Sequence, residues 1–322
     1  MTKTAITMGD AAGVGPEIIL KAMKAQPQYQ EQCVVFGAAK VLRYYNEKWR
    51  MGLTLREIDS CKEAAAGCVN VIDPFPIAME EFTVGQLSAR CGDGAYRYLE
   101  AAVQNAMAGE VSAVVTAPLN KEALHMGGHM FAGHTEILAA LTGVKSYAML
   151  LWSESLKVIH VSTHVSLRRA CDLATKERVA QVIRLGDRVL KKAGLALPRI
   201  AVAGLNPHAG EHGLFGEEEQ TQLIPAIKEC RAEGIDVTGP EAPDTVFLKG
   251  SRGTYDLVVA MYHDQGHIPL KLLDFKKGVN MTVGLPVIRT SVDHGTAFDI
   301  AGTGQADETS LLEALQIAVQ LA

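Results

Sequence analysis

An α/β fold is the class that the sequence predicts, and two patterns indicate it. Short β-branched runs, such as residues 111–116 and 256–260, are typical of buried parallel strands, because a strand covered on both faces needs no polar alternation. Longer helical stretches lie between these runs, among them an alanine-rich one over residues 86–108. Strands and helices that alternate along a whole chain indicate a parallel sheet covered by helices.

The strand predictions follow the β-branched runs and the residues that end them. The run at 111–116 stops at Ala117-Pro118, since proline disfavours a helical conformation in the residue before it. Ser153 and Glu154 form a polar turn between two neighbouring strands, and the stretch 52–76 is mostly irregular. Strands are expected at residues 4–8, 33–36, 69–72, 111–116, 147–152, 157–161, 199–203 and 256–260.

The helix predictions rest on caps and on apolar faces. Pro16 suits the first turn of a helix that follows the first strand. Thr175 is expected to cap a helix that ends before Gly194 and has apolar residues near one face. Helices are expected at residues 17–25, 86–108, 176–193, 223–233 and 310–322. No internal repeat and no Pro/Gly-rich linker marks a domain boundary.

The composition limits the class of protein. The chain has 322 residues, 48% of them hydrophobic, which is enough for one or two α/β domains. Its 31 basic and 36 acidic residues give a net charge of −5 without a basic stripe, so nucleic acid is not an expected partner. We expect neither a signal peptide nor a membrane span, since no apolar stretch reaches about 18 residues. Six scattered cysteines without a C-x-x-C pair indicate reduced thiols in a cytoplasmic protein.

Three of the predicted strands lead to a histidine, namely His164, His208 and His263. In an open α/β sheet, ligands bind beyond the carboxyl ends of the strands, so three imidazoles from distant positions can converge there. Three neutral imidazoles with an open fourth position form the ligand set of a catalytic divalent metal. The alternative is three separate histidines, each bonded to a nearby carbonyl. The pattern by itself leaves both interpretations open.

Two glycine-containing loops precede predicted helices. Residues 9–15 sit where a loop can cradle a phosphate, but glycines at 9, 13 and 15 match neither G-x-G-x-x-G nor a Walker loop. A tight strand-to-helix turn is the alternative. Gly133-His134-Thr135-Glu136 places a histidine and a threonine where a helix N-terminus attracts anions. An ordinary helix cap is the alternative there.

Charged and amide side chains near and after His263 are candidate ligand contacts. Arg289, expected in a loop after residues 285–288, offers a guanidinium fork that matches a phosphate or a carboxylate. Asp244 is a carboxylate that can orient a metal-bound imidazole. Taken singly, Lys271, Asn280 and Arg289 are also typical of ordinary surface residues.

Four motifs, together with Gly9-Asp10 near the start, resemble the 4-hydroxythreonine-4-phosphate dehydrogenase family. They occur in the family's order and extend to Gly302, over nearly the whole chain. The motifs are Gly133-His134-Thr135-Glu136, Asn206-Pro207-His208-Ala209-Gly210-Glu211, Met261-Tyr262-His263-Asp264-Gln265-Gly266 and Arg289-Thr290-Ser291-Val292-Asp293-His294-Gly295-Thr296-Ala297.

The resemblance implies the two-lobed fold of the isocitrate and isopropylmalate dehydrogenase superfamily, with the active site in the cleft between the lobes. Residues 1–135 and 280–322 are expected to form one lobe, and residues 136–279 the other. A homodimer is also implied, with each site near the dimer interface. The implied reaction is NAD-dependent oxidation of a secondary alcohol in a 4-phosphorylated four-carbon acid, followed by loss of the carboxylate as CO2.

The resemblance also implies a role for individual residues. The implied ligands of one divalent cation (Zn, Mg, Mn or Co) are His164, His208 and His263. The implied substrate contacts are His134, Thr135, Lys271, Asn280 and Arg289. The implied NAD contacts lie in a loop without a Rossmann fingerprint and are His294, Gly295, Thr296, Ala297 and Asp299. Lys271 and Asp244 are the candidates for proton transfer.

Ala11 departs from the family's usual Gly-Asp-Pro-Ala-Gly loop and resembles a second branch that acts on sugar acids. The expected substrates are then D-threonate or D-erythronate 4-phosphate, which would give dihydroxyacetone phosphate. The alternative is 4-hydroxy-L-threonine 4-phosphate, the vitamin B6 pathway substrate, which would give 3-amino-2-oxopropyl phosphate. Two rivals come from other classes: a metal-dependent phosphoester hydrolase and a binding protein without catalytic activity. The loop at 294–302 argues against the hydrolase, because a hydrolase has no use for a dinucleotide.

Overall fold

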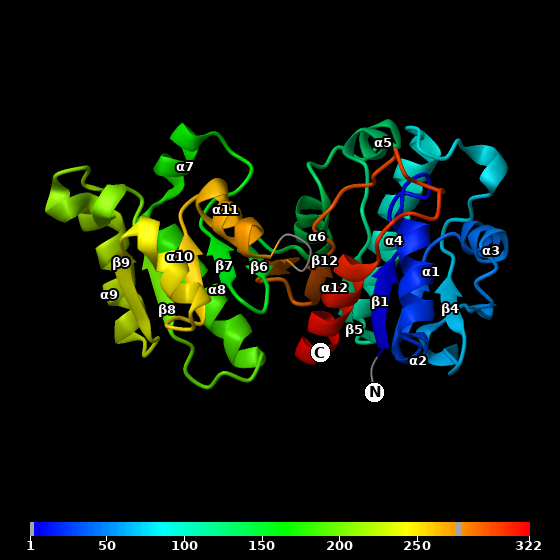
Figure 1. The fold of residues 1–322 in the computed structure, drawn as a ribbon, viewed down its shortest axis with the longest axis horizontal. Coiled ribbons are helices and arrows are strands. Elements are labelled where there is room, and N and C mark those ends of the chain that lie inside the picture. Colours follow the sequence, from blue (N-terminus) through cyan, green and yellow to red (C-terminus); the bar gives the residue numbers. More distant parts are fainter. Residues whose placement is uncertain (1–2, 275–277) are drawn as a thin grey trace. The chain divides into compact units, whose positions relative to one another are not determined.

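The computed structural model describes residues 3–274 and 278–322. The chain forms two compact units, which we call unit 1 (Met1–Val144 with Leu285–Ala322) and unit 2 (Lys145–Gly284). Each unit combines a sheet with helices, so the predicted α/β class is confirmed (Figure 1). The sequence places the divisions at 135/136 and 279/280, whereas the chain passes between units at 144/145 and 284/285.

Unit 1 is built on strands in the order β3-β4-β2-β1-β5-β12, and each adjacent pair is parallel. Strand β12 comes from the C-terminal segment and pairs with β5, with Arg289 opposite Val114. This pairing is what returns the end of the chain to unit 1. The strands are β1 (Lys3–Thr7), β2 (Cys33–Phe36), β3 (Leu55–Glu57), β4 (Val69–Ile72), β5 (Val111–Thr116) and β12 (Ile288–Ser291).

Some helices of unit 1 begin where a side chain caps them or where proline fits. Pro16 lies in the first turn of α1, as predicted. Helix α4 begins at Ala89, not at residue 86, because the Ser88 hydroxyl accepts a hydrogen bond from the Cys91 N–H at 3.3 Å. The helices are α1 (Gly15–Ala25), α2 (Gln28–Gln32), α3 (Ala39–Lys48), α4 (Ala89–Met107), α5 (Lys121–Met126), α6 (His134–Thr142) and α12 (Thr309–Leu321).

Unit 2 has strands in the order β11-β6-β7-β10-β8-β9. Strand β6 is antiparallel to both β7 and β11, while β7, β10, β8 and β9 are parallel to one another. The strands are β6 (Ala148–Trp152), β7 (Lys157–His160), β8 (Ile200–Ala203), β9 (Val237–Glu241), β10 (Leu257–Ala260) and β11 (Val279–Val283). The helices are α7 (Leu167–Leu173), α8 (Lys176–Lys192), α9 (Ile224–Ala232), α10 (Pro243–Ser251) and α11 (His263–Leu273).

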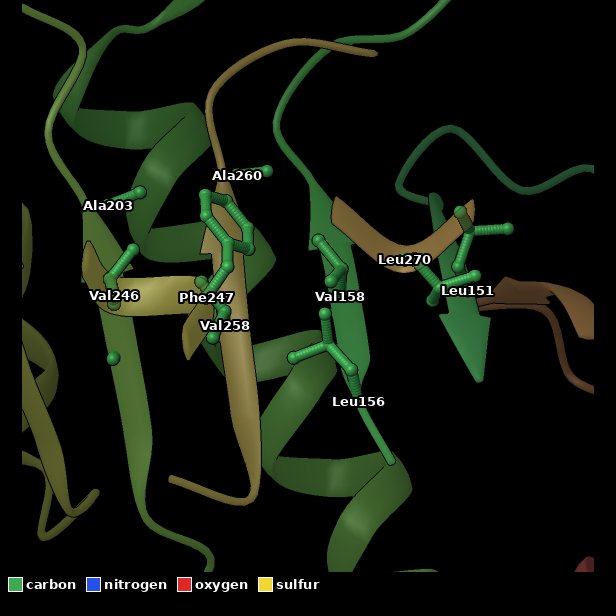
Figure 2. Packing of buried hydrophobic residues seen from close by; sticks show 10 residues of the cluster. Leu151, Leu156, Val158, Ala203, Val246, Phe247, Val258, Ala260 and Leu270 are labelled. Atoms are coloured by element: carbon green, nitrogen blue, oxygen red, sulfur yellow. The ribbon is translucent and has the colours of Figure 1, made fainter. Parts of the chain in front are cut away.

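One hydrophobic cluster of unit 2 lies between its strands and helices α10 and α11 (Figure 2). Phe247 of α10 and Leu270 of α11 pack against strand side chains that include Val158 and Val258. Burying an aliphatic or aromatic side chain of this size contributes about 1.5–3 kcal/mol. The packing therefore fixes both helices on the strands whose ends carry the histidines.

Several predictions about elements are confirmed and one is wrong. The two neighbouring strands around the Ser153-Glu154 turn are β6 and β7, and Thr175 caps α8 by accepting from the Arg178 N–H at 3.3 Å. The loop expected for Arg289 is wrong, because this residue lies in strand β12 and is 3% exposed. The sequence did not predict this strand, because it consists of only four residues, three of which are polar: Ile288-Arg289-Thr290-Ser291. Within residues 3–274 and 278–322, no helix has both the length and the apolar composition needed to cross a bilayer.

Candidate active site

His164 and His263, two of the three predicted metal-binding histidines, follow the ends of neighbouring strands. Hydrogen bonds join the segments that leave these two strands. Strand β10 lies between β7 and β8 and is parallel to both, so the loops after these strands leave the sheet at one edge. The Val161 N–H donates to the Ala260 carbonyl at 2.8 Å, and the Ser162 hydroxyl donates to the Met261 carbonyl at 2.9 Å. The sheet thus positions the His164 and His263 segments side by side, as the sequence pattern predicts.

His164 and His263 are neighbours. Their ring centroids lie 5.9 Å apart, and two imidazoles on one ion lie roughly 5 Å apart for metal–nitrogen bonds of about 2 Å. His263 donates from Nδ1 to the Asp264 Oδ1 at 2.7 Å. This bond selects the tautomer whose Nε2 carries a lone pair, which is the arrangement that carboxylates give to metal-binding histidines. These donors therefore fit a divalent ion.

The carboxylate that orients His263 is Asp264, not Asp244. Asp244 lies in the first turn of α10 and is exposed. Both carboxylates line one cavity of about 560 Å³, together with Tyr262, Gln265 and a group of apolar side chains from α10 and α11. Sequence analysis missed Asp264, although its position directly after His263 offered a signal.

Two further histidines lie against His263. The His267 ring stacks on the His263 ring at 3.6 Å between centroids and 11° between planes, and the His160 ring is 4.8 Å from that of His267. His160 is buried, and burial, reinforced by His267, lowers the pKa of its imidazole to about 3. It is therefore neutral at physiological pH. The i, i+4 spacing of His263 and His267 was the available signal for this cluster.

His208 is presented by a different kind of segment. It lies in the helical turn Pro207–Gly213, where it has a φ of 53°, and its ring is 6.1 Å from that of Phe215. Across the two described stretches of the chain, no three His, Cys, Asp or Glu side chains are grouped to hold a metal ion. Within the described residues, His164 and His263 thus lie together, and His208 is not grouped with them.

Gln265 links the loop of His208 to the loop of His263. Its side-chain oxygen accepts from the Met261 N–H at 2.7 Å, and its side-chain nitrogen donates to the Gly204 carbonyl at 2.8 Å. Met261 follows β10 directly, and Gly204 follows β8. The glutamine of the Tyr262-His263-Asp264-Gln265-Gly266 motif therefore holds two histidine-bearing loops in a fixed relation.

Unit 1 contains a buried cationic group around Arg289. Its Nη2 donates to the Thr116 hydroxyl at 2.7 Å. Burial lowers the pKa of Arg289 to about 9, and the nearby Glu136 carboxylate opposes this shift, so the guanidinium stays charged at neutral pH. Burial and, secondarily, the charge of Arg289 hold the pKa of His134 well below its usual range. The expectation that Arg289 taken singly is a surface charge is therefore wrong.

Helix α6 places His134 and Thr135 in its first turn, next to this cationic group. Its N-cap residue is Gly133, which has no side chain to cap the helix. The positive end of a helix and a buried guanidinium in one neighbourhood suit an anion such as a phosphate. The remaining predicted contacts belong to unit 2: Lys271 lies half-buried in α11, and Asn280 lies in β11 with its Oδ1 buried and without a partner among the described residues.

The two loops at Gly9–Gly15 and His294–Gly302 pack against each other. The Val14 N–H donates to the Thr296 carbonyl at 3.0 Å, and a Cβ at Gly13 would lie 2.9 Å from the Thr296 Cβ. Ala297 has a φ of 42°, an uncommon conformation for a non-glycine residue. Asp299 and His294 are exposed. The predicted cofactor loop is therefore held by the first loop, with polar side chains left at the surface.

A second contact fixes the residues after this loop. The buried Glu17 carboxylate accepts hydrogen bonds from the Ala306 N–H at 2.8 Å and the Gly304 N–H at 3.3 Å. Lys21 lies 3.0 Å from the same carboxylate and donates to the Gly304 and Ala306 carbonyls. Helix α1 thus anchors the chain on the C-terminal side of the cofactor loop.

Comparison with known proteins agrees with these motifs. A family model described as pyridoxal phosphate biosynthetic protein PdxA matches residues 29–318. The D-threonate 4-phosphate dehydrogenase of Salmonella typhimurium is 54% identical over 100% of this chain and 99% of that protein. The enzyme of the same name from Pectobacterium atrosepticum is 52% identical over 99% of this chain and 98% of that protein.

A solved structure gives the same result for the fold. The 4-hydroxythreonine-4-phosphate dehydrogenase of Klebsiella pneumoniae is 50% identical, with a TM-score of 0.92 over 100% of this chain and 99% of that one. The relatives named here are dehydrogenases. This protein is accordingly an oxidoreductase, and the family that its motifs predict is confirmed. The chain belongs to the pyridoxal phosphate biosynthetic protein PdxA family.

Proposed function

We propose that the protein oxidises and decarboxylates a 4-phosphorylated four-carbon hydroxy acid, using NAD and one divalent metal ion. The observation that carries this proposal is the His263–Asp264 contact beside His164, which prepares imidazole donors for a metal. NAD⁺ would supply the acceptor for the hydride of the alcohol carbon, and a base would take the hydroxyl proton. The resulting 3-keto acid loses CO2, and the enolate that remains takes up a proton.

The metal ligands that we propose are His164, His208 and His263. When bound, a divalent ion supplies a Lewis acid that polarises the alcohol and ketone oxygens. The Asp264 carboxylate holds the tautomer of His263, and Gln265 holds the two loops.

The substrate contacts that we propose bind two anionic groups, the phosphate and the carboxylate of the acid. Arg289, with His134 and Thr135 beside it, suits the phosphate, because a guanidinium and a helix N-terminus both favour a doubly charged anion. Lys271 and Asn280 are proposed to contact the acid end. Lys271 and Asp244 remain the candidates for proton transfer. Asp244 lines the same cavity as Asp264.

The loop at 294–302 is proposed to bind NAD through His294, Gly295, Thr296, Ala297 and Asp299. Its backbone is fixed by Val14 and by the Glu17–Lys21 pair, so its shape is set before the cofactor arrives. The exposed Asp299 offers a carboxylate acceptor of the kind that binds ribose hydroxyls in other dinucleotide sites.

A homodimer is also part of the proposal. One chain groups His164 with His263 but does not complete a three-histidine set within its described residues, so we propose that a second copy supplies the missing ligand. An apolar face beside His263 supports this: the cavity that Asp264 lines is bordered by the exposed side chains Leu248, Ile268, Leu272 and Leu273. Exposed apolar patches of this kind mark interaction sites.

The substrate that we propose is a sugar acid, D-threonate 4-phosphate or D-erythronate 4-phosphate, and its product would be dihydroxyacetone phosphate. Two relatives above 50% identity bear the name D-threonate 4-phosphate dehydrogenase. Ala11, buried in the first loop, supports the same branch.

The test is turnover by metal-free protein to which Mn²⁺, Zn²⁺, Mg²⁺ or Co²⁺ is returned singly. With the sugar acids, the amount of NADH formed, measured by its absorbance, should equal the amount of CO2 released. Dihydroxyacetone phosphate should accumulate. Full activity after complete chelation would exclude a requirement for a divalent metal ion. Release of inorganic phosphate without NADH would instead support a hydrolase.

A further inference from the structure

The segment that carries His208 has an unusual backbone. Five consecutive residues, from His208 to His212, have φ between 40° and 79°. Four of them are not glycine, and L-residues avoid this left-handed region because Cβ approaches the following carbonyl oxygen. Such a run persists only where surrounding groups determine it. The neighbours of this segment therefore control the place of the His208 imidazole.

The main neighbour is Glu219, a fully buried carboxylate. Its Oε1 accepts from the Leu205 N–H at 2.8 Å and the Asn206 N–H at 2.7 Å. Its Oε2 accepts from the Asn206 side-chain amide at 2.9 Å. A buried carboxylate is costly without such donors, so the chain before His208 and the carboxylate stabilise each other.

Gly210, which follows His208 in the same turn, also lies close to Glu219. A Cβ at Gly210 would lie 2.6 Å from the Glu219 Oε2, so the glycine lets the backbone approach the carboxylate. Glu219 itself begins a π-helical turn, Glu219–Leu223, a rare conformation that occurs mainly at functional sites. His208 is thus bracketed by residues that contact one buried carboxylate.

We propose that Glu219 is a positioning residue that holds His208 in the orientation from which it binds the metal ion. The inference rests on the proposed function, because it takes His208 as a ligand. It assigns to Glu219 no contact with metal or substrate. Carboxylates that position metal ligands typically affect metal affinity by about 10–100-fold, and we expect an effect of this size.

The test compares Glu219→Gln with Glu218→Gln in the full-length protein. The glutamine has the same shape, but it removes the charge and turns an amide donor toward the N–H groups around it. Glu218 is the matched control, since it also accepts from the Asn206 side chain, at 2.8 Å, but among the described residues it has no hydrogen bond to the backbone before His208. The measured quantities are the Kd for Mn²⁺ of the metal-free protein, by calorimetry, and the KM for NAD.

We expect Glu219→Gln to raise the Kd for Mn²⁺ by about 10–100-fold, with an unchanged KM for NAD and with turnover partly restored by excess Mn²⁺. Glu218→Gln should change the Kd for Mn²⁺ by less than about threefold. In the double variant with His208→Ala, Glu219→Gln should add no further loss, because coupled residues are not additive. A folded Glu219→Gln protein with wild-type Mn²⁺ affinity, or additive losses in the double variant, would overturn the inference.

A second variant covers the case in which Glu219→Gln does not fold. Asn206→Ala removes one donor to Glu219 and leaves the carboxylate in place, so it should weaken Mn²⁺ binding in the same direction. Unchanged Mn²⁺ affinity in Asn206→Ala would then contradict the inference. Wild-type protein that binds no divalent ion would refute the proposed function itself, which separates the two failures.

Discussion

The Arg289 side chain donates from Nη2 to the hydroxyl of Thr116 at 2.7 Å, although 173 positions separate the two residues in the sequence. The parallel pairing of β12 with β5 brings them together. The hydroxyl orients one edge of a guanidinium that is 3% exposed, beside His134 and Glu136. A buried cation held in this way is fixed in direction before an anion arrives, which lowers the entropy lost on binding.

Arg289→Lys tests whether this group binds the substrate phosphate. Lysine keeps the charge but loses the planar fork and the bond to Thr116. We expect kcat/KM for the phosphorylated acid to fall by roughly 10–100-fold, since hydrogen bonds to charged groups are worth about 1.5–3 kcal/mol. The control is Thr116→Val, which removes only the orienting hydroxyl and should cost less. Wild-type kinetics in Arg289→Lys would rule out the role.

Asp10→Asn tests an effect of pH on stability. Asp10 is buried, its Oδ1 accepts from the Ala12 N–H at 2.9 Å, and its Oδ2 is buried without a partner among the described residues. Burial raises the pKa of Asp10 from 3.8 to about 6. The folded state therefore favours the protonated acid, and the stability from this group is complete below pH 3.8 and lost as the pH rises through about 6.

We expect the free energy of unfolding of the wild type to fall, relative to Asp10→Asn, by about 2 kcal/mol between pH 4 and pH 7. Urea unfolding at several pH values measures the difference. Any cost of the new amide is the same at each pH and cancels. A difference between the two proteins that stays constant over this range would show that Asp10 titrates alike in the folded and unfolded chains.

Mixed dimers test whether two copies share the metal ligands. His164 and His263 are neighbours in one chain, so His208 is the ligand that a second copy is proposed to contribute. When His164→Ala and His208→Ala proteins are unfolded together and refolded, about a quarter of the sites should be intact if dimers form at random. The pair His164→Ala and His263→Ala is the control and should recover nothing. No recovery in the first mixture would place all three ligands on one chain.

Asp299→Ala tests the cofactor loop. Because Asp299 is exposed and its loop is held by Val14, its removal should leave the fold intact. We expect the KM for NAD to rise by roughly tenfold, corresponding to about 1.4 kcal/mol, while the KM for the acid changes little. Asp59→Ala removes another exposed carboxylate of unit 1 and serves as the control. Equal changes in both Michaelis constants would argue against a role in NAD binding.

The sequence predicts most strands of the described chain, because buried parallel strands appear in it as apolar runs, but fewer than half of its α-helices. Strands β2, β4 and β5 have the predicted bounds for this reason. Strand β12 was missed, since its residues are polar and its place depends on pairing with β5, far away in the chain. The burial of Arg289 could not be predicted without that pairing.

The candidate site shows the same limit. The strand-end positions of His164 and His263 follow from the sequence, because parallel strands share an edge. The contact between His263 and Asp264 depends on the geometry of the start of α11, and the support of His208 depends on Glu219, which lies eleven positions later in the chain.

A comparison of two substrates tests the branch of the family. The side chains proposed to bind the substrate include Lys271 and Arg289, whereas the carboxylate proposed for the site, Asp244, is a candidate for proton transfer. An ammonium group beside the substrate carboxylate would be repelled and poorly solvated there, whereas a neutral hydroxyl would not. We expect kcat/KM for D-threonate 4-phosphate to exceed that for 4-hydroxy-L-threonine 4-phosphate by at least about tenfold, or roughly 1.4 kcal/mol. The measurement uses saturating NAD and metal.

The pH dependence of this ratio provides the control. As the pH approaches the pKa of the substrate amine, the ammonium loses its proton and the discrimination should narrow. Changes in the enzyme affect both substrates and cancel in the ratio. A ratio that favours the amino acid at neutral pH would show that a group in the site accepts the ammonium. It would place the protein in pyridoxal phosphate synthesis, with the roles proposed for the histidines and for the NAD loop unchanged.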